Sequence, residues 1–194
     1  MKVLIVYAHP NTNSFNHAIL GLFTEGLAEA GHTAEVVDLY EIGFDPCLSG
    51  NDLTMLIQGK TPDDIQAQQE KVSSAEGIVF IHPVWWTGPP AILKGWVDRV
   101  FSMGFAYAFD EKDGHPLGLL KNQKALIIST AGASQEEAEA MGSTYALNKS
   151  ESEGIFKFCG IKDVQHVIFY NVVMADDETR KGYLEKARQL GREF

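Results

Sequence analysis

The chain has 194 residues, a formal net charge of −10 at pH 7 and an apolar fraction of 45%. This negative balance disfavours nonspecific binding to nucleic acid or to an anionic membrane, because both require a basic face. No apolar run is long enough to span a membrane, and Cys47 and Cys159 lack the spacing of a disulfide framework or a metal site. We therefore expect one domain over residues 1–194, located in the cytoplasm, with no metal ion, no nucleic-acid partner and no membrane insertion.

Apolar segments typical of strands alternate with helical patterns along the chain. Strands are predicted at residues 2–8, 33–39, 78–81, 124–130 and 163–173. Helices are predicted after a cap at Ser14, after a Thr61 cap with Pro62 in the first helical position, and in the amphipathic segment that carries Leu93 and Trp96. Three more are predicted at 135–146, 151–159 and 177–193, whereas 40–51 and 104–118 are expected to be loops.

This alternation predicts an α/β three-layer sandwich, in which helices cover both faces of a five-stranded parallel sheet. The expected strand order is the flavodoxin-like 2-1-3-4-5. In that order the loops after the first, third and fourth strands converge at the carboxyl edge of the sheet. A ligand site is expected where they meet.

The first of these loops, residues 9–16, contains neither a G-x-G-x-x-G nor a G-x-x-x-x-G-K-[ST] motif, which disfavours a glycine-turn dinucleotide site and an NTPase. It instead offers His9 and Ser14 beside a helix N-terminus. Backbone N–H groups at such a terminus bind anions, so a phosphate without a metal ion is expected here.

The other two loops favour a flat ligand. The loop after the third strand carries two tryptophans with Val84 and Thr87, and the loop after the fourth strand reads Ser129-Thr130-Ala131-Gly132, whose small residues allow close approach to the backbone. A phosphate site, an aromatic wall and small polar donors together fit a flavin better than other common ligands.

Two segments also carry a family resemblance. Residues 7–16 (YAHPNTNSFN) and 82–101 (HPVWWTGPPAILKGWVDRVF), with Phe105-Ala106-Tyr107 and residues 154–160 (GIFKFCG), resemble the NAD(P)H:quinone oxidoreductases of the DT-diaphorase type. The resemblance covers most of the chain. It implies a cytoplasmic homodimeric flavoenzyme, usually with FAD, that takes hydride from NADH or NADPH and passes two electrons to a quinone.

The resemblance also implies roles for individual residues. The phosphates would be held by His9, Ser14, Phe15 and Asn16, and the isoalloxazine by Pro83, Val84, Trp85, Trp86, Thr87, Ser129, Thr130, Ala131 and Gly132. The substrate pocket would be lined by Trp86 and closed by Tyr107 and Phe109, in this family across the dimer interface.

Departures from the family pattern leave three points open. The Tyr and His that relay charge in the family are replaced here by Ala133-Ser134-Gln135-Glu136-Glu137, so the catalytic group is expected to be the flavin itself, with Tyr145 as the candidate side chain. A shorter segment before Thr61 keeps FMN as the alternative to FAD. The missing C-terminal extension leaves the choice of NADH or NADPH open.

Two other functions remain as alternatives. One is a flavin-binding regulatory subunit of a transporter or transcription system, which the loss of the relay residues motivates. The other is a one-electron flavodoxin-type carrier, which the aromatic segment Phe105 to Phe109 disfavours because a carrier keeps its flavin edge accessible.

Overall fold

A computed structural model describes every residue from Met1 to Phe194. Its central sheet contains five parallel strands: β1 (Lys2–Tyr7), β2 (Thr33–Asp38), β3 (Gly77–Pro83), β6 (Lys124–Thr130) and β7 (Asp163–Phe169). They are ordered β2-β1-β3-β6-β7, so the predicted order 2-1-3-4-5 is confirmed. The three central strands are almost fully buried, which explains their near-continuous apolar sequences.

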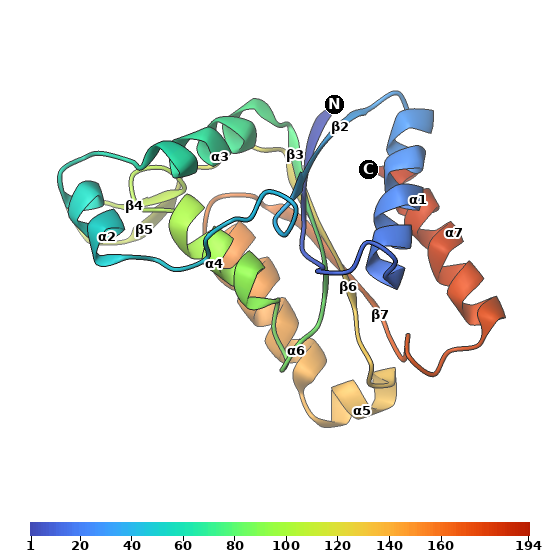
Figure 1. Cartoon of the computed structure of the whole chain (residues 1–194). Helices are drawn as coiled ribbons and strands as arrows, with labels where there is room; N and C mark the ends of the chain where they lie inside the picture. The colour runs from blue at the N-terminus through green and yellow to red at the C-terminus, as the bar shows by residue number, and fades with distance from the viewer.

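Helices cover both faces of the sheet (Figure 1). One face carries α1 (Phe15–Glu29) and α7 (Asp177–Glu193), and the other carries α3 (Asp63–Ser74), α4 (Ala91–Val100) and the π-helix η1 (Asn148–Lys157). The shorter elements are α2 (Gly50–Ile57), α5 (Gln135–Ala140), α6 (Ser143–Leu147) and an antiparallel hairpin of β4 (Tyr107–Phe109) and β5 (Pro116–Gly118). None of the helices combines the length and the apolar character needed to cross a bilayer.

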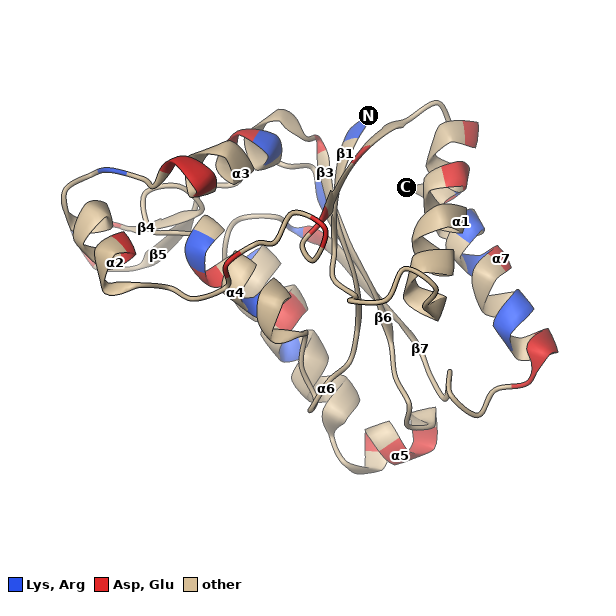
Figure 2. Cartoon of the chain, viewed as in Figure 1, with Lys and Arg blue, Asp and Glu red and all other residues tan.

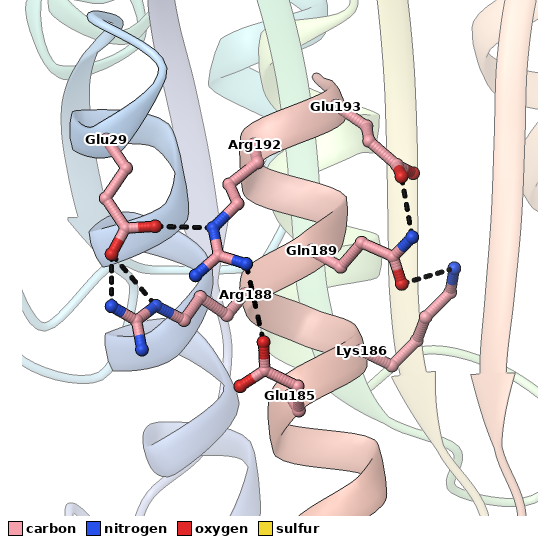
Figure 3. A network of polar contacts seen from close by, with 7 residues as sticks. All are labelled: Glu29, Glu185, Lys186, Arg188, Gln189, Arg192 and Glu193. Carbon is pink, nitrogen blue, oxygen red and sulfur yellow. Dashed lines mark hydrogen bonds and ion pairs between the residues drawn. The ribbon is translucent and has the colours of Figure 1, made fainter.

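Helices α1 and α7 touch through their backbones. A Cβ atom added at Gly26 would lie 2.1 Å from the carbonyl oxygen of Arg188, and one added at Gly191 would lie 2.2 Å from that of Phe23. Outside this contact Glu29 accepts hydrogen bonds from Arg188 and Arg192 (Figure 3). Close packing between α1 and α7, with apolar side chains toward the sheet and charge pairs on the outer surface, therefore holds this layer together.

The opposite layer mixes aromatic packing with buried polar groups. The rings of Phe80 and Phe156 lie 4.7 Å apart, and Trp96 packs edge-on to Phe80 at 5.9 Å. Arg99 is buried and joins α4 to two other helices. Its guanidinium contacts Asp52 in the first turn of α2 and Asp64 in α3, both at 2.9 Å.

Some predicted helix boundaries were wrong. Thr61 does not cap α3, because Pro62 keeps an extended ψ of 145° and precedes the first helical residue, Asp63, without a side-chain cap. Two first-turn carboxylates supply the favourable charge instead. The helix expected over 135–146 is divided by Gly142, whose φ of 74° is left-handed.

Other segments also differ from the expectation. Helix α2 begins inside the expected loop 40–51, and the expected loop 104–118 contains the β4–β5 hairpin. Strand β7 ends at Phe169 rather than at 173, since Asn171 adopts a φ of 54° that no strand accommodates. The segment expected to be helical from residue 151 is a π-helix that begins at Asn148.

Candidate functional site

The loops after β1, β3 and β6 meet at the carboxyl edge of the sheet, as expected. The Asn16 side-chain amide donates to Thr130 Oγ1 at 2.9 Å, and the backbone N–H of Val84 donates to the Thr130 carbonyl at 2.8 Å. The rings of His9 and Trp85 lie 6.3 Å apart, centroid to centroid. Three segments that are distant in sequence thus form one surface.

The first loop ends in a capped helix N-terminus. Ser14 Oγ accepts the N–H of His17 at 3.2 Å and lies 3.3 Å from the Tyr7 hydroxyl, whose pKa is raised, chiefly by burial, so that the phenol stays protonated. The backbone N–H groups of Phe15 and Asn16 have no acceptor within the protein. They are free to bind an anion.

The second loop is a tight and strained turn. Trp85 and Gly88 exchange backbone hydrogen bonds at 2.9 and 3.1 Å, and between them Trp86 and Thr87 have φ values of 52° and 57°. Two left-handed central residues define a type I′ turn, in which Gly and Asn are usual. Each L-residue with a Cβ costs roughly 1–2 kcal/mol in this conformation, and such strain clusters at functional sites.

This turn presents a large apolar surface and free donors. The Trp86 side chain is fully exposed, at 103% of its reference area, while Trp85 is 42% exposed. The backbone N–H groups of Trp86 and Thr87 have no acceptor within the protein. A bare indole beside free N–H donors is typical of a site for a flat, partly polar molecule.

Most of the third loop lies below the surface. Ser129, Thr130 and Ala131 are buried, and only Gly132 is exposed. Ser129 Oγ lies 2.8 Å from His166 Nε2, so this side chain is directed into the protein. The N–H of Gly132 has no protein acceptor and is the donor that this loop offers to a ligand.

The three loops carry no carboxylate, lysine or arginine, although the chain has a net charge of −10. Such residues are absent from 8–24, 77–93 and 125–135, and in Figure 2 the loops are tan while the nearby helix α5 is partly red. An anion bound at this site would therefore be held by neutral donors.

The predicted substrate-pocket residues do not meet within one chain. Tyr107 and Phe109 pack edge-on with their centroids 5.8 Å apart and line a hollow with Phe158, beside the last turn of α4. Trp86 precedes the first turn of the same helix and does not line that hollow. A shared pocket would need a second copy of the chain, as the family resemblance implies.

The catalytic candidate Tyr145 lies on α6 and is exposed. Ser143 at the start of α6 lies 3.4 Å from the Thr87 hydroxyl, so this helix adjoins the strained turn. The position is suitable for a residue at the rim of the site.

Sequence reasoning missed a buried polar group below the loops. His82 Nε2 lies 2.9 Å from Glu151 Oε2, and both side chains are essentially inaccessible. His82 stands in the quoted motif, but nothing in its spacing indicates a partner 69 residues away. Glu151 follows a polar stretch and reads as a solvent-facing acid.

Comparison with known proteins agrees with this geometry. Residues 1–190 match the model of a family described as having a flavodoxin-like fold. An NAD(P)H oxidoreductase of Haemophilus influenzae is 38% identical over 97% of this chain and 93% of its own length, and human ribosyldihydronicotinamide dehydrogenase [quinone] is 34% identical over 93% and 86%. The solved NAD(P)H:quinone oxidoreductase of Methanothermobacter marburgensis has a TM-score of 0.90 and 37% identity, covering 100% of this chain and 96% of that one.

The chain therefore belongs to the flavodoxin-like family that contains the NAD(P)H:quinone oxidoreductases. The resemblance and the oxidoreductase class predicted from the sequence are confirmed. These relatives are named as enzymes and give no support to the alternative of a regulatory subunit.

Proposed function

We propose that the protein binds a flavin where the three loops meet and passes two electrons from NADH or NADPH to a quinone or a similar flat acceptor. The observation that carries this proposal is the strained turn at Trp86 and Thr87, which holds an exposed indole and free N–H groups beside the capped N-terminus of α1. The relatives named as NAD(P)H:quinone oxidoreductases support it.

The donor set suits the two ends of a flavin. The N–H groups of Phe15 and Asn16, with Ser14 and the half-buried His9, would hold the phosphates. The ring would lie against the turn that contains Trp86, and the N–H groups of Thr87 and Gly132 would face its polar edge. The proposed set also includes Pro83, Val84, Trp85, Ser129, Thr130 and Ala131, with Ser129 acting from beneath.

A flavin held here would supply hydride chemistry, linking oxidation of the nicotinamide to reduction of a quinone by two electrons and two protons. The residues of the chain would orient the reactants, exclude water and supply fixed N–H dipoles, which is where most of the catalytic benefit of such a site originates. Tyr145 is proposed as the side chain closest in role to the family relay. FAD is the proposed cofactor, with FMN as its alternative.

A homodimer is part of the proposal. Exposed apolar side chains lie on and beside the hairpin that carries Tyr107 and Phe109: Phe109 is 51% exposed, Leu117, which pairs with Ala108, is 45% exposed, and Met103, which is bridged to Tyr107, is 46% exposed. A second copy that covers this surface would bring its own Tyr107 and Phe109 to Trp86 and close the substrate pocket. The cytoplasm is the proposed location.

The test is to purify the protein and identify the small molecule released on denaturation by mass spectrometry. We expect FAD or FMN, and we expect the holoprotein to oxidise NADH or NADPH in the presence of a quinone. A colourless protein that takes up neither flavin and shows no such turnover would refute the proposal. A stable semiquinone in a reductive titration, without quinone turnover, would favour the one-electron carrier.

A further inference from the structure

A row of polar side chains crosses three strands directly beneath the site. His82 in β3 pairs in register with Ser129 in β6, and Ser129 Oγ lies 2.8 Å from His166 Nε2 in β7. Glu151 of η1 covers the row and contacts His82. The neighbouring part of this layer is aromatic, so the polar row stands out from its surroundings.

The contacts of His82 determine how many protons the pair holds. His82 Nδ1 lies 3.0 Å from the carbonyl oxygen of Pro83, which can only accept, so Nδ1 must carry a proton. The 2.9 Å contact between Nε2 and Glu151 Oε2 needs one more proton, on either atom. The pair therefore holds two protons and is neutral overall, either as imidazolium with carboxylate or as imidazole with carboxylic acid.

Loss of one of these protons would break a contact. With a single proton on Nε2, the lone pair of Nδ1 would face the Pro83 carbonyl oxygen at 3.0 Å, and with a single proton on Nδ1 two acceptors would meet at Glu151. The other oxygen of Glu151, Oε1, is buried and has no protein partner, so His82 alone fixes the carboxyl group.

Stability alone does not account for such a pair. Removing two charged or polar groups from water costs free energy that their attraction seldom exceeds, and apolar replacements of similar volume are often neutral or stabilising. The pair contacts the backbone where β3 ends, one residue before Val84 and two before the strained turn begins at Trp85. This position indicates that the pair acts on the turn rather than on the stability of the core.

We propose that His82 and Glu151 are positioning residues: Glu151 holds the His82 ring through Nε2, so that Nδ1–H donates to the Pro83 carbonyl oxygen and fixes the turn that presents Trp86 and its N–H donors. This inference rests on the proposed flavin site. The π-helix contributes because it holds Glu151 inside the layer, and wide helical turns of this kind are frequent at functional sites.

The test compares Glu151→Gln, Glu151→Leu and a matched control, Ser152→Ala. A Gln amide donates to Nε2 while Nδ1 keeps its proton, so Glu151→Gln should keep flavin affinity within about twofold of the wild type. Glu151→Leu leaves the buried His82 Nε2 without a partner, so the apo form should remain folded but be less stable than the wild type, and it should bind flavin about tenfold more weakly, with a shifted visible spectrum. Ser152 is buried beside Glu151 without a partner for its hydroxyl, and its removal should change neither quantity.

Two results would overturn the inference. A Glu151→Leu protein with unchanged flavin affinity and spectrum would show that the pair does not position the turn. An equal loss in Glu151→Gln and Glu151→Leu would show that charge, not the hydrogen bond, is what matters.

A second measurement does not depend on flavin. Nitrogen-15 NMR of the histidine rings in the wild-type apoprotein should show a proton on His82 Nδ1, with the signal assigned through its change in Glu151→Gln. An unprotonated Nδ1 would overturn the inference while leaving the proposed function intact. Wild-type protein that binds no flavin would instead refute the proposed function, whatever the His82 signal shows.

Discussion

The two helical layers of the molecule differ in what they bury. The layer of α1 and α7 is apolar against the sheet and places its charges outside, around Glu29, whereas the opposite layer buries Arg99, His82 and Glu151. Buried polar groups cost stability unless they are fully paired, and close apolar packing does not. The comparison teaches that close backbone packing and buried polar groups are divided between the two layers, although α1 also contributes its N-terminus to the site.

The largest expected effect concerns the layer of α1 and α7. Gly26→Ala should destabilise the fold by about 3 kcal/mol, because the new Cβ would lie 2.1 Å from a backbone oxygen of α7. Gly21→Ala on the same helix is the control, since nothing lies within 4 Å of its Cβ position, and it should stabilise by up to about 1 kcal/mol. Thermal or urea unfolding of both variants measures this difference, and equal stabilities would contradict the predicted contact.

The next effect concerns the site itself. Trp86→Ala should weaken flavin retention or substrate binding by about 2 kcal/mol, because the exposed indole is the surface that a ligand would cover. Trp85→Ala should have a smaller effect, since that ring is already partly covered beside His9. Titration of the apoproteins with flavin, and KM for the acceptor, would measure both. Equal and negligible losses would show that the turn is structural.

The third effect is the pH dependence of the free energy of unfolding, which involves His166 beneath the site. Burial lowers the pKa of His166 to about 4, so the folded protein keeps this ring neutral while the unfolded chain protonates it near 6.5. Its contribution to stability is therefore complete above pH 6.5 and is lost as pH falls from there toward 4, by at most about 1.4 kcal/mol per pH unit. His166→Gln should flatten that part of a stability profile measured by urea unfolding. A variant with the wild-type slope would assign the pH dependence to other groups.

The smallest effect concerns the strained turn. Thr87→Gly should stabilise the protein by about 1 kcal/mol, because glycine adopts a φ of 57° without the cost borne by a β-branched residue. The Trp86 surface and the backbone donors would remain. Differential scanning calorimetry of the apoprotein measures the change, and a loss of stability would mean that the Thr87 contact with Ser143 outweighs the strain.

Much of this architecture could be predicted from the sequence. Continuous apolar runs such as 124–130 define central strands, and Ser14 marks the start of α1 because a hydroxyl before an amphipathic segment is a reliable cap. The convergence of three loops followed from the sheet order alone. Local chemistry was sufficient where one short segment determines its own structure.

The features that could not be predicted depend on distant partners or on backbone conformation. The partner of His82 lies in a helix whose widened turns carry no recognisable signature, and Glu151 resembles its exposed neighbours. The left-handed Trp86 and Thr87 contradict the preferences of their residue types, as expected where strain is retained for function. A helix break at Gly142 could have been predicted from the glycine, but the residues on both sides of it follow a helical pattern.

The neutral character of the three loops affects how the protein would respond to ionic strength. Sites that hold phosphates with lysine and arginine lose affinity as salt rises, because screening weakens the attraction. Here the donors are uncharged and the surrounding molecule is anionic, with a net charge of −10, so screening reduces a repulsion instead. Added salt should then raise the affinity for an anionic cofactor, whereas it lowers the affinity of a basic phosphate pocket.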